Sequence, residues 1–276
     1  MTILLIHQAF VPPTEAGGTR HFEFAQHCIE QGLDFTIVAS DLSYLSGQKT
    51  TARSQLISEQ NINGIRVLRA YTYPALHRSF VWRIISFLSF MLTSIIAGLR
   101  GSNVDIVLGT SPPIFQAFSA WVVAFLKRRP FILEVRDLWP EFAIDMGVLK
   151  NPLLIWLAQR LETFLYNRAK HLIVNSPAYR TYLIKKGIPE KKITLIPNGV
   201  DPTMFSPENR GENIRQSFQL NGKFVAVYAG ALGLANDIYL ILEAAKQLKE
   251  TSQVHILLVG DGKERQKLED RAKELN

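Results

Sequence analysis

Short, continuous runs of apolar residues recur along the first 200 residues, and longer segments with helical spacing separate most of them. The runs lie at residues 3–6, 35–39, 65–73, 104–108, 131–135, 172–175 and 193–196. They are short and bounded by loop-forming residues, so we predict a β-strand at each one. Apolar strands that alternate with helices are typical of a parallel sheet covered on both faces.

The apolar pattern breaks at residues 197–222, which are rich in Pro, Asn and Gly and show little periodicity. It then restarts with two strand–helix units that run to residue 276. We therefore predict an α/β protein with a first domain at residues 1–200, a linker at 201–222 and a second domain at 223–276. Two strands leave apolar surface uncovered, so we expect the second Rossmann-like domain to be incomplete unless a partner completes the sheet.

Two predicted helices are unusually apolar. Residues 84–99 contain no charge and lie between Arg83 and Arg100, and residues 114–126 lead into a basic run at 127–129. The first segment is near the lower length limit for a bilayer span. It is either a helix buried against the sheet or a helix whose outer side docks on an anionic membrane. A true span is disfavoured because strands and helices surround the segment on both sides.

Composition limits the classes of protein. Hydrophobic residues make up 47% and charged residues 20%, which is typical of a globular chain. Cys28 is the only cysteine, which excludes a disulfide framework and a Cys-based zinc site and fits a reducing compartment. The first residues resemble a strand rather than a signal peptide. The histidines lack metal-ligand spacing, so we predict no metal site.

The net charge is +7, and the basic excess lies in residues 1–200. It indicates either an anionic partner or a solvated basic face. Nucleic acid is disfavoured as the partner, since the basic residues are not interleaved with aromatics in a known module. A phosphate-bearing substrate and a membrane surface remain.

The first strand leads through a loop that ends in Gly17 and Gly18 into a predicted helix over residues 19–31. Glycines let backbone N–H groups approach a ligand closely, and a helix N-terminus favours an anion. A diphosphate could therefore bind here, with Arg20 adding positive charge. The alternative is a simple turn with Arg20 exposed. The spacing is not the GxGxxG of dinucleotide-binding dehydrogenases.

The stretch EVRDLWPE (134–141) is the densest candidate for chemistry. It places Arg136, Asp137 and Glu141 after a predicted strand, at the sheet edge where open α/β folds bind ligands. Two structural alternatives are an internal Arg–carboxylate pair and an N-cap from Asp137 to the next helix. We expect Trp139 to be a packing residue.

Several landmarks occur together in one order: PPTEAGGTR (12–20), TSPP (110–113), EVRDLWPE (134–141), NSPAY (175–179), ITLIPNGVDPTMF (193–205), YAGALG (228–233) and ILLVGDGKERQKLE (256–269). On these motifs the chain resembles family 4 glycosyltransferases, which have the GT-B fold. In particular it is similar to the bacterial cell-surface polysaccharide branch with an EVRDLWP-type motif.

The resemblance implies that the first domain holds the acceptor and the second holds a nucleoside-diphosphate sugar. It implies transfer with retained anomeric configuration, without a metal or cofactor, to a lipid-linked or polysaccharide acceptor in the cytoplasm, at the inner face of the membrane. The site residues it implies or favours are catalytic Arg136 and Asp137; donor-binding Gly17, Gly18, Asn198 and Gly230; and acceptor-binding Arg20 and Glu141.

The chain departs from the family pattern in three places. Residues 231–240 lack the Arg and Lys that commonly neutralise the leaving diphosphate, and Arg136 stands where many members have His. The paired-glutamate motif of the family is expected beyond residue 276. Two other functions therefore stay open: a non-catalytic module that binds acceptor and membrane, and a nucleotide-sugar 2-epimerase of the same architecture. The apolar helix and its basic flanks favour the transferase over the epimerase.

Overall fold

The computed structural model describes residues 1–15, 17–43, 47–50, 55–75, 80–100, 103–200, 202, 205–251 and 253–275. The chain divides into two compact units, Met1–Gly199 and Val200–Asn276. We call them unit 1 and unit 2. A short helix, α7 (Glu212–Ser217), lies within the segment predicted as linker.

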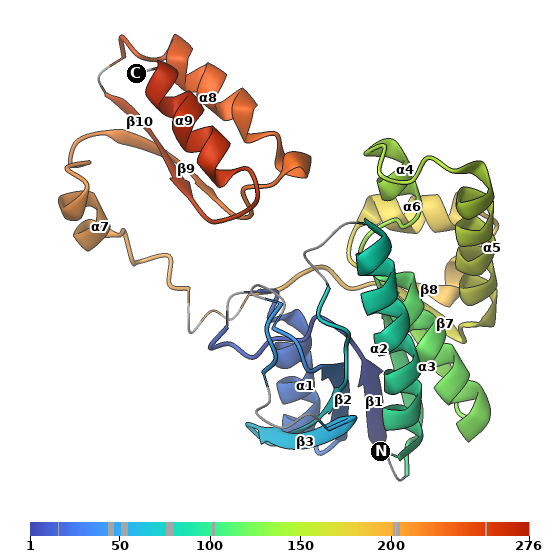
Figure 1. The fold of residues 1–276 in the computed structure, drawn as a ribbon. Helices are drawn as coiled ribbons and strands as arrows, with labels where there is room; N and C mark the ends of the chain where they lie inside the picture. Colours follow the sequence, from blue (N-terminus) through green and yellow to red (C-terminus); the bar gives the residue numbers. More distant parts are fainter. Residues whose placement is uncertain are drawn as a thin grey trace. The chain divides into compact units, whose positions relative to one another are not determined.

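Unit 1 is built on an eight-stranded sheet (Figure 1), with strand order β3-β4-β2-β1-β5-β6-β7-β8 in the described part of the chain. The strands are β1 (Thr2–Ile6), β2 (Asp34–Ser40), β3 (Ile57–Ile62), β4 (Ile65–Ala70), β5 (Ile106–Ser111), β6 (Phe131–Val135), β7 (His171–Val174) and β8 (Ile193–Leu195). The helices are α1 (Arg20–Glu30), α2 (Phe80–Arg100), α3 (Ile114–Lys127), α4 (Glu141–Asp145), α5 (Pro152–Arg168), α6 (Pro177–Lys185) and the 3-10 turn η1 (Glu190–Lys192).

The predicted parallel sheet is present, but its edge strand β3 is antiparallel to β4 and was not predicted from the apolar pattern. Its sequence is ISEQNI, so polar residues interrupt the apolar run that would predict a buried strand. A two-residue turn, Asn63-Gly64, joins β3 to β4, and both turn residues have positive φ. Asn-Gly is the strongest short hairpin signal in a sequence, so this strand was detectable from its turn.

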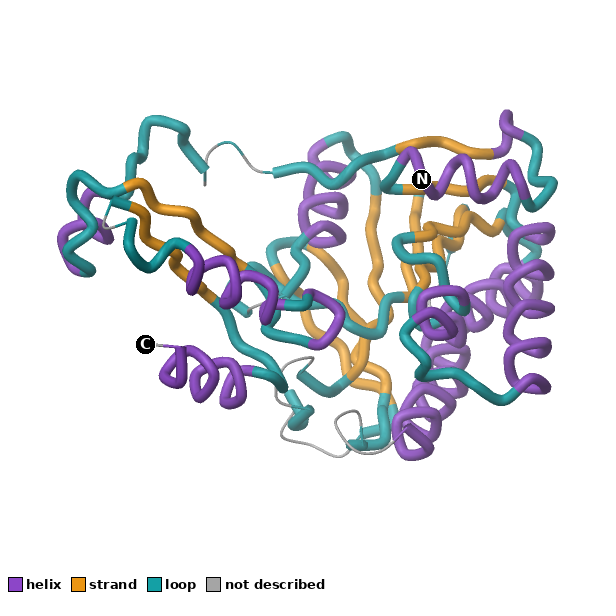
Figure 2. The backbone as a smooth tube through the Cα atoms, turned by 90° about the horizontal axis from the view of Figure 1, so that it is seen from above, coloured by secondary structure: helices purple, strands orange, loops and turns teal. Residues whose placement is uncertain are grey.

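Helices cover both faces of this sheet, as Figure 2 shows for the central strands. On one face, Phe22, Ala25 and Cys28 of α1 pack against apolar residues of β1, β2 and β4. On the other face, α2 and α3 pack against the sheet, and Phe90 and Ala97 of α2 are almost completely buried. Both predicted faces of the α/β architecture are therefore present in unit 1.

Helix α2 is buried on one side only. Among the described residues it is the one helix that is long and apolar enough to cross a membrane, and one third of its most apolar window is buried. Its opposite side exposes Val81, Ile85, Leu88, Leu92, Ile96 and Leu99, which recur at three- and four-residue spacing. The two predictions for this segment each describe one of its faces: the inner side packs on the sheet, and the outer side is an exposed apolar stripe.

Unit 2 contains two parallel strands, β9 (Phe224–Ala229) and β10 (Val254–Val259). Helices α8 (Ile238–Gln247) and α9 (Arg265–Leu275) pack together, and the 3-10 turn η2 (Leu234–Asn236) precedes α8. Its main buried cluster consists of Leu232, Ile238, Leu242 and Leu268, and Leu220 is buried as well. Phe224 and Val227 of β9 are 71% and 59% exposed, so the expected uncovered apolar surface is present.

Candidate functional site

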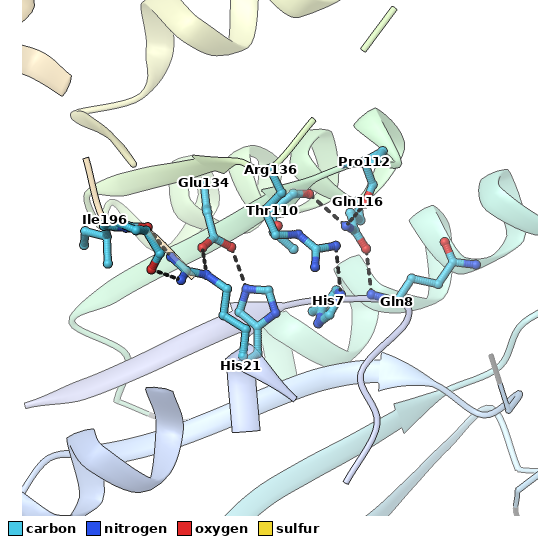
Figure 3. A network of polar contacts seen from close by, with 11 residues as sticks. His7, Gln8, His21, Thr110, Pro112, Gln116, Glu134, Arg136 and Ile196 are labelled. Atoms are coloured by element: carbon cyan, nitrogen blue, oxygen red, sulfur yellow. Dashed lines mark hydrogen bonds and ion pairs between the residues drawn. The ribbon is translucent and has the colours of Figure 1, made fainter. Parts of the chain in front are cut away.

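The candidate site of unit 1 lies where β1, β5 and β6 end (Figure 3). His7 follows β1, Thr110 is at the end of β5, and Glu134 and Arg136 are at the end of β6. Because the strands are parallel, their carboxyl ends meet at one edge of the sheet. That is the edge where open α/β sheets bind ligands.

The centre of the site is an ion-pair network around Glu134, which is 4% exposed. One carboxylate oxygen accepts from Arg20 Nε at 2.8 Å, and the other lies 2.6 Å from His21 Nε2. Burial raises the pKa of Glu134, but the hydrogen bonds and charges of His21 and Arg20 outweigh it and lower the pKa to about 2. Glu134 is therefore ionised at neutral pH, and His21 donates to it.

Arg20 also donates to the backbone carbonyls of Ile196 and Pro197, at 2.9 and 2.8 Å. These contacts tie the start of α1 to the ends of β6 and β8. The internal Arg–carboxylate pair considered for Arg136 is thus formed by Arg20 and Glu134 instead. Arg20 is 19% exposed, so the simple exposed alternative for this residue is wrong. Its predicted acceptor role stays a prediction.

Arg136 points toward His7, and its terminal nitrogen lies 3.3 Å from His7 Nε2. An arginine can only donate, so this ring nitrogen accepts and the neutral ring carries its proton on Nδ1. Burial lowers the pKa of His7 well below its ordinary value, and the charges of His21 and Arg136 lower it further. His7 therefore stays neutral and holds the guanidinium without repelling it.

Part of this network has no partner within the described residues. The buried atoms His7 Nδ1, His21 Nδ1 and Arg136 Nε make no hydrogen bond there. The rings of His7 and His21 lie 4.3 Å apart, tilted by 60°. Buried polar atoms are normally paired, so these unpaired atoms distinguish this edge of the sheet from ordinary core and mark it as a candidate site.

Gln116 of α3 connects the loop after β1 to the end of β5. It is completely buried, and its side-chain oxygen accepts from the N–H of Gln8 at 2.6 Å. Its side-chain nitrogen donates to the carbonyls of Thr110 and Pro112. A saturated buried amide of this kind holds the loop at one position and therefore positions His7.

Asp137 and Glu141 follow Arg136 on the same stretch. Asp137 accepts a long 3.5 Å bond from the hydroxyl of Tyr179, and burial raises its pKa although Arg136 and Tyr179 oppose the shift. Helix α4 has Pro140 as its N-cap without a side-chain cap bond, so the predicted capping role of Asp137 is wrong. Glu141 begins α4 and accepts from Tyr182 at 3.0 Å. Trp139 packs against the core, which confirms its prediction.

The predicted donor-binding residues of unit 1 lie in two loops. Gly17 packs so closely on Val11 that a Cβ atom would come within 2.7 Å of it, whereas Gly18 has open space around it. Helix α1 begins at Arg20, directly after these glycines. Asn198 is exposed and follows the two carbonyls that Arg20 binds. Their role in donor binding stays a prediction.

In unit 2, the N–H of Gly230 donates to the carbonyl of Val259 at 2.9 Å. This N–H is occupied within the unit, so a phosphate would need other donors from the same loop. A Cβ atom on Gly260 would lie 1.8 Å from the carbonyl oxygen of Gly230. The glycine of the VGDG turn thus serves close packing between the ends of β9 and β10.

Comparisons with known proteins decide the family. Residues 16–199 match the model of the glycosyl transferase 4-like domain, and residues 209–276 match the model of glycosyl transferases group 1. The chain belongs to the glycosyltransferases. The first model alone covers more than half of the chain, and both match in the order expected from the motifs.

Individual relatives agree with this family. The α-galactosylglucosyldiacylglycerol synthase of Streptococcus pneumoniae is 31% identical over 108 residues, which are 38% of this glycosyltransferase chain and 29% of the relative. HepE of Anabaena, solved with UDP-glucose, is 18% identical and superimposes with a TM-score of 0.65 over 100% of this chain and 66% of its own. The fold is therefore GT-B.

A third relative shows that this fold alone does not select the reaction. The UDP-GlcNAc 2-epimerase of Methanocaldococcus jannaschii is 15% identical, with a TM-score of 0.56 over 100% of this chain and 69% of its own. The chain spans about two thirds of the length of these solved relatives and less than a third of the Streptococcus pneumoniae synthase.

Three residues of the network, His7, His21 and Glu134, were not predicted as site residues of this glycosyltransferase from its sequence. The pairs are 113 residues apart for His21 and Glu134 and 129 residues apart for His7 and Arg136. No local spacing reveals such pairs. One signal was present: a charged Glu134 inside the apolar run 131–135 is costly to bury unless it is paired.

Proposed function

We propose that the chain carries the acceptor-binding half and part of the donor-binding half of an enzyme that transfers a sugar from a nucleoside diphosphate to a lipid-linked or polysaccharide acceptor. The observation that supports it most is Arg136, a guanidinium held by neutral His7 at the ligand-binding edge of the sheet, in a chain of this family. A planar guanidinium with unused donors suits a phosphate.

In the proposed reaction, the bond between the sugar and the diphosphate breaks, and its electron pair goes to the diphosphate oxygen. The acceptor hydroxyl forms the new bond to the sugar carbon on the same face, so the configuration is retained. The leaving diphosphate takes the hydroxyl proton. Arg136 stabilises the charge that develops on the leaving group, and Asp137 orients Arg136 or contacts the acceptor. No metal or cofactor enters this scheme.

The test is sugar transfer by the 276-residue protein, with UDP-glucose and GDP-mannose as donors and a bacterial membrane lipid extract as acceptor. Arg136→Gln should lower kcat by about 100-fold or more, since a lost donor to transition-state charge typically has that effect. Arg66→Gln is the control: it removes an arginine whose partner is the exposed Glu59. Equal kcat for both variants contradicts the role of Arg136.

The same preparation separates the alternatives. Calorimetric titration with UDP, GDP and UDP-glucose, with and without anionic vesicles, distinguishes a transferase from a module that binds only the membrane. Vesicle binding without nucleotide binding or sugar transfer supports the non-catalytic module. Conversion of UDP-GlcNAc to its 2-epimer, without transfer, supports the epimerase.

The proposed membrane partner rests on α2 and the end of α3. Lys127 of α3 donates to the carbonyl of Leu99, so the C-terminal ends of α2 and α3 lie close together. The exposed stripe of α2 therefore ends near two exposed apolar residues of α3, Phe125 (67% exposed) and Leu126 (55% exposed). The basic run 127–129 follows directly. An apolar face beside basic residues suits the interface of an anionic bilayer, as the cytoplasmic leaflet provides.

Vesicle co-sedimentation tests this surface. Leu92→Glu should weaken binding to phosphatidylglycerol vesicles by about tenfold, since it places a charge in the apolar stripe. Leu240→Glu is the matched control, because Leu240 is 70% exposed on α8 and Leu92 is 60% exposed on α2. Equal binding by both variants argues against docking through α2.

A further inference from the structure

A pocket with several polar side chains in its lining lies apart from the Arg136 network, among α4, α5 and the C-terminal end of α6. Its volume is about 350 Å³, within the range of small-molecule sites. Gln159, Thr163 and Asn167 of α5 line it together with Glu141, Lys186 and the buried Ile188.

The wall of this pocket is prearranged by ionic contacts. Lys186 forms an ion pair with Glu162, which is 1% exposed, and lies 3.4 Å from Glu141. The Tyr182 hydroxyl donates to Glu141 at 3.0 Å and also contacts Glu162 at 3.4 Å. The lysine, tyrosine and two carboxylates therefore fix one another, so the pocket wall keeps its shape.

Hydrogen-bonding capacity remains for a ligand. Both contacts of Glu141 end on Oε1, so within the described residues Oε2 keeps its lone pairs. Within the described residues, the side-chain amides of Gln159 and Asn167 also make no hydrogen bond. The side-chain contacts that these two residues accept, from Thr163 and Lys192, end on their backbone carbonyls. A carboxylate and two amides accept from and donate to hydroxyl groups, which themselves both donate and accept.

Charge narrows the class of ligand. The carboxylates of Glu141 and Glu162 pair with Lys186, and Lys192 donates to the backbone carbonyls of Tyr166 and Asn167 beside the pocket, so two carboxylates face two lysines. A phosphate or a uronic acid would find no surplus of positive charge to pair with here. An uncharged polyhydroxyl compound needs no such partner. The chemistry of the pocket thus suits a neutral sugar.

One face of α6 connects this pocket to the candidate catalytic residues. Tyr179, Tyr182 and Lys186 share that face and its C-cap, and the Tyr179 hydroxyl contacts Asp137. Seven residues of helix separate Tyr179 from Lys186, a rise of about 10 Å. The pocket is too far along the helix to hold the reacting hydroxyl at Asp137, but a second or third sugar of a chain would reach it.

We propose that this pocket is a distal subsite for a neutral glycan unit of the acceptor, beyond the sugar that reacts. The assignment of an acceptor rests on the proposed function, whereas the binding of a neutral sugar does not. In this proposal Glu141, which was predicted to bind the acceptor, contacts the distal sugar unit in the pocket.

The test is the Ile188 side-chain methyl signal in an NMR spectrum of the whole 276-residue protein, assigned with Ile188→Val. Titration with maltose, cellobiose and lactose should shift this signal at millimolar concentration, and glucose 1-phosphate should shift it far less. The double variant Gln159→Ala/Asn167→Ala should weaken sugar binding by about tenfold, the effect of losing two hydrogen bonds.

Thr163→Val and Thr181→Val form a matched pair, since each hydroxyl donates to the carbonyl four residues earlier in its helix. Only Thr163 lines the pocket, so only its variant should change sugar binding. No shift with any neutral disaccharide, equal affinity for glucose 1-phosphate, or unchanged binding in the double variant overturns the proposal. Because the titration needs no nucleotide sugar, its outcome is independent of whether the protein transfers sugar.

Discussion

Unit 1 and unit 2 are built from the same strand–helix repeat, yet they differ in how completely they bury it. In unit 1 the central strands β1, β2 and β5 are covered by helices on both faces. Unit 1 also holds the buried ion pair between Arg20 and Glu134. In the described part of unit 2 the core is one small cluster around Leu232 and Ile238, and β9 exposes Phe224 and Val227. Repeated strand–helix units bury their own apolar surface only when enough strands pair in one sheet and helices cover both of its faces.

The stability of each unit can be measured separately. All four tryptophans, at positions 82, 121, 139 and 156, belong to unit 1. Tryptophan fluorescence therefore follows the unfolding of unit 1, and hydrogen exchange of the β9 and β10 amides follows unit 2. Each variant below should change one signal and leave the other unchanged.

The largest effect is expected from Glu134→Gln, which removes the charge that pairs with Arg20 and His21. Loss of one partner of a buried ion pair costs about 3–5 kcal/mol of unfolding free energy. Urea titration followed by tryptophan fluorescence measures it. Glu59→Gln, which breaks the exposed pair with Arg66, should change the midpoint little. Similar midpoints for both variants would mean that the buried network does not stabilise unit 1.

Acid should destabilise unit 1 through the same carboxylate. The pKa of Glu134 is about 2 in the folded protein and about 4.3 in an unfolded chain. Because the folded value is the lower one, this stabilisation is fully present above about pH 4.5 and is lost as the pH falls toward 2. The loss is on the order of 3 kcal/mol. Urea midpoints between pH 5 and pH 3 should fall more steeply for the natural protein than for Glu134→Gln, and parallel slopes would contradict this assignment.

The smallest of the three effects is expected in unit 2. Gly260→Ala places a Cβ atom 1.8 Å from the carbonyl oxygen of Gly230, so the ends of β9 and β10 must separate. Such overpacking costs about 1–3 kcal/mol. Amide exchange in β9 and β10 should become faster while the tryptophan signal stays unchanged. Gly233→Ala is the control, because a Cβ atom there meets nothing within 4 Å. Equal exchange rates in both variants would show that the turn accommodates the Cβ atom without a loss of stability in unit 2.

The sequence predicted the repeating elements well because their signals are local. The strand predicted at 131–135 has the observed bounds, and the helix predicted at 19–31 is found at Arg20–Glu30. The polar edge strand β3 was missed, since an edge strand does not need an apolar run. Helix α7 was missed because it lies in a segment read as linker.

For the site, the sequence singled out Arg136 and Asp137 from their position after a strand, but it did not reveal what holds them. His7 supports Arg136 from 129 residues away, and Tyr179 contacts Asp137 from 42 residues away. Local spacing cannot show pairs that exist only because separate strand ends meet at one edge of the sheet. The pocket beside α6 is of the same kind, since residues of α4 and α5 line it together with Lys186 and Ile188, which follow α6.

By itself, the sequence determined the alternation of strands and helices, the family and the stretch that carries Arg136. These properties depend on residues close together in the chain, where periodicity and motifs act. Only the tertiary structure decided that Glu134 is ionised and buried, that His7 is neutral, and that α2 has one exposed apolar face. Burial and pairing across the sheet set those states, because they depend on neighbours that the folded chain brings together.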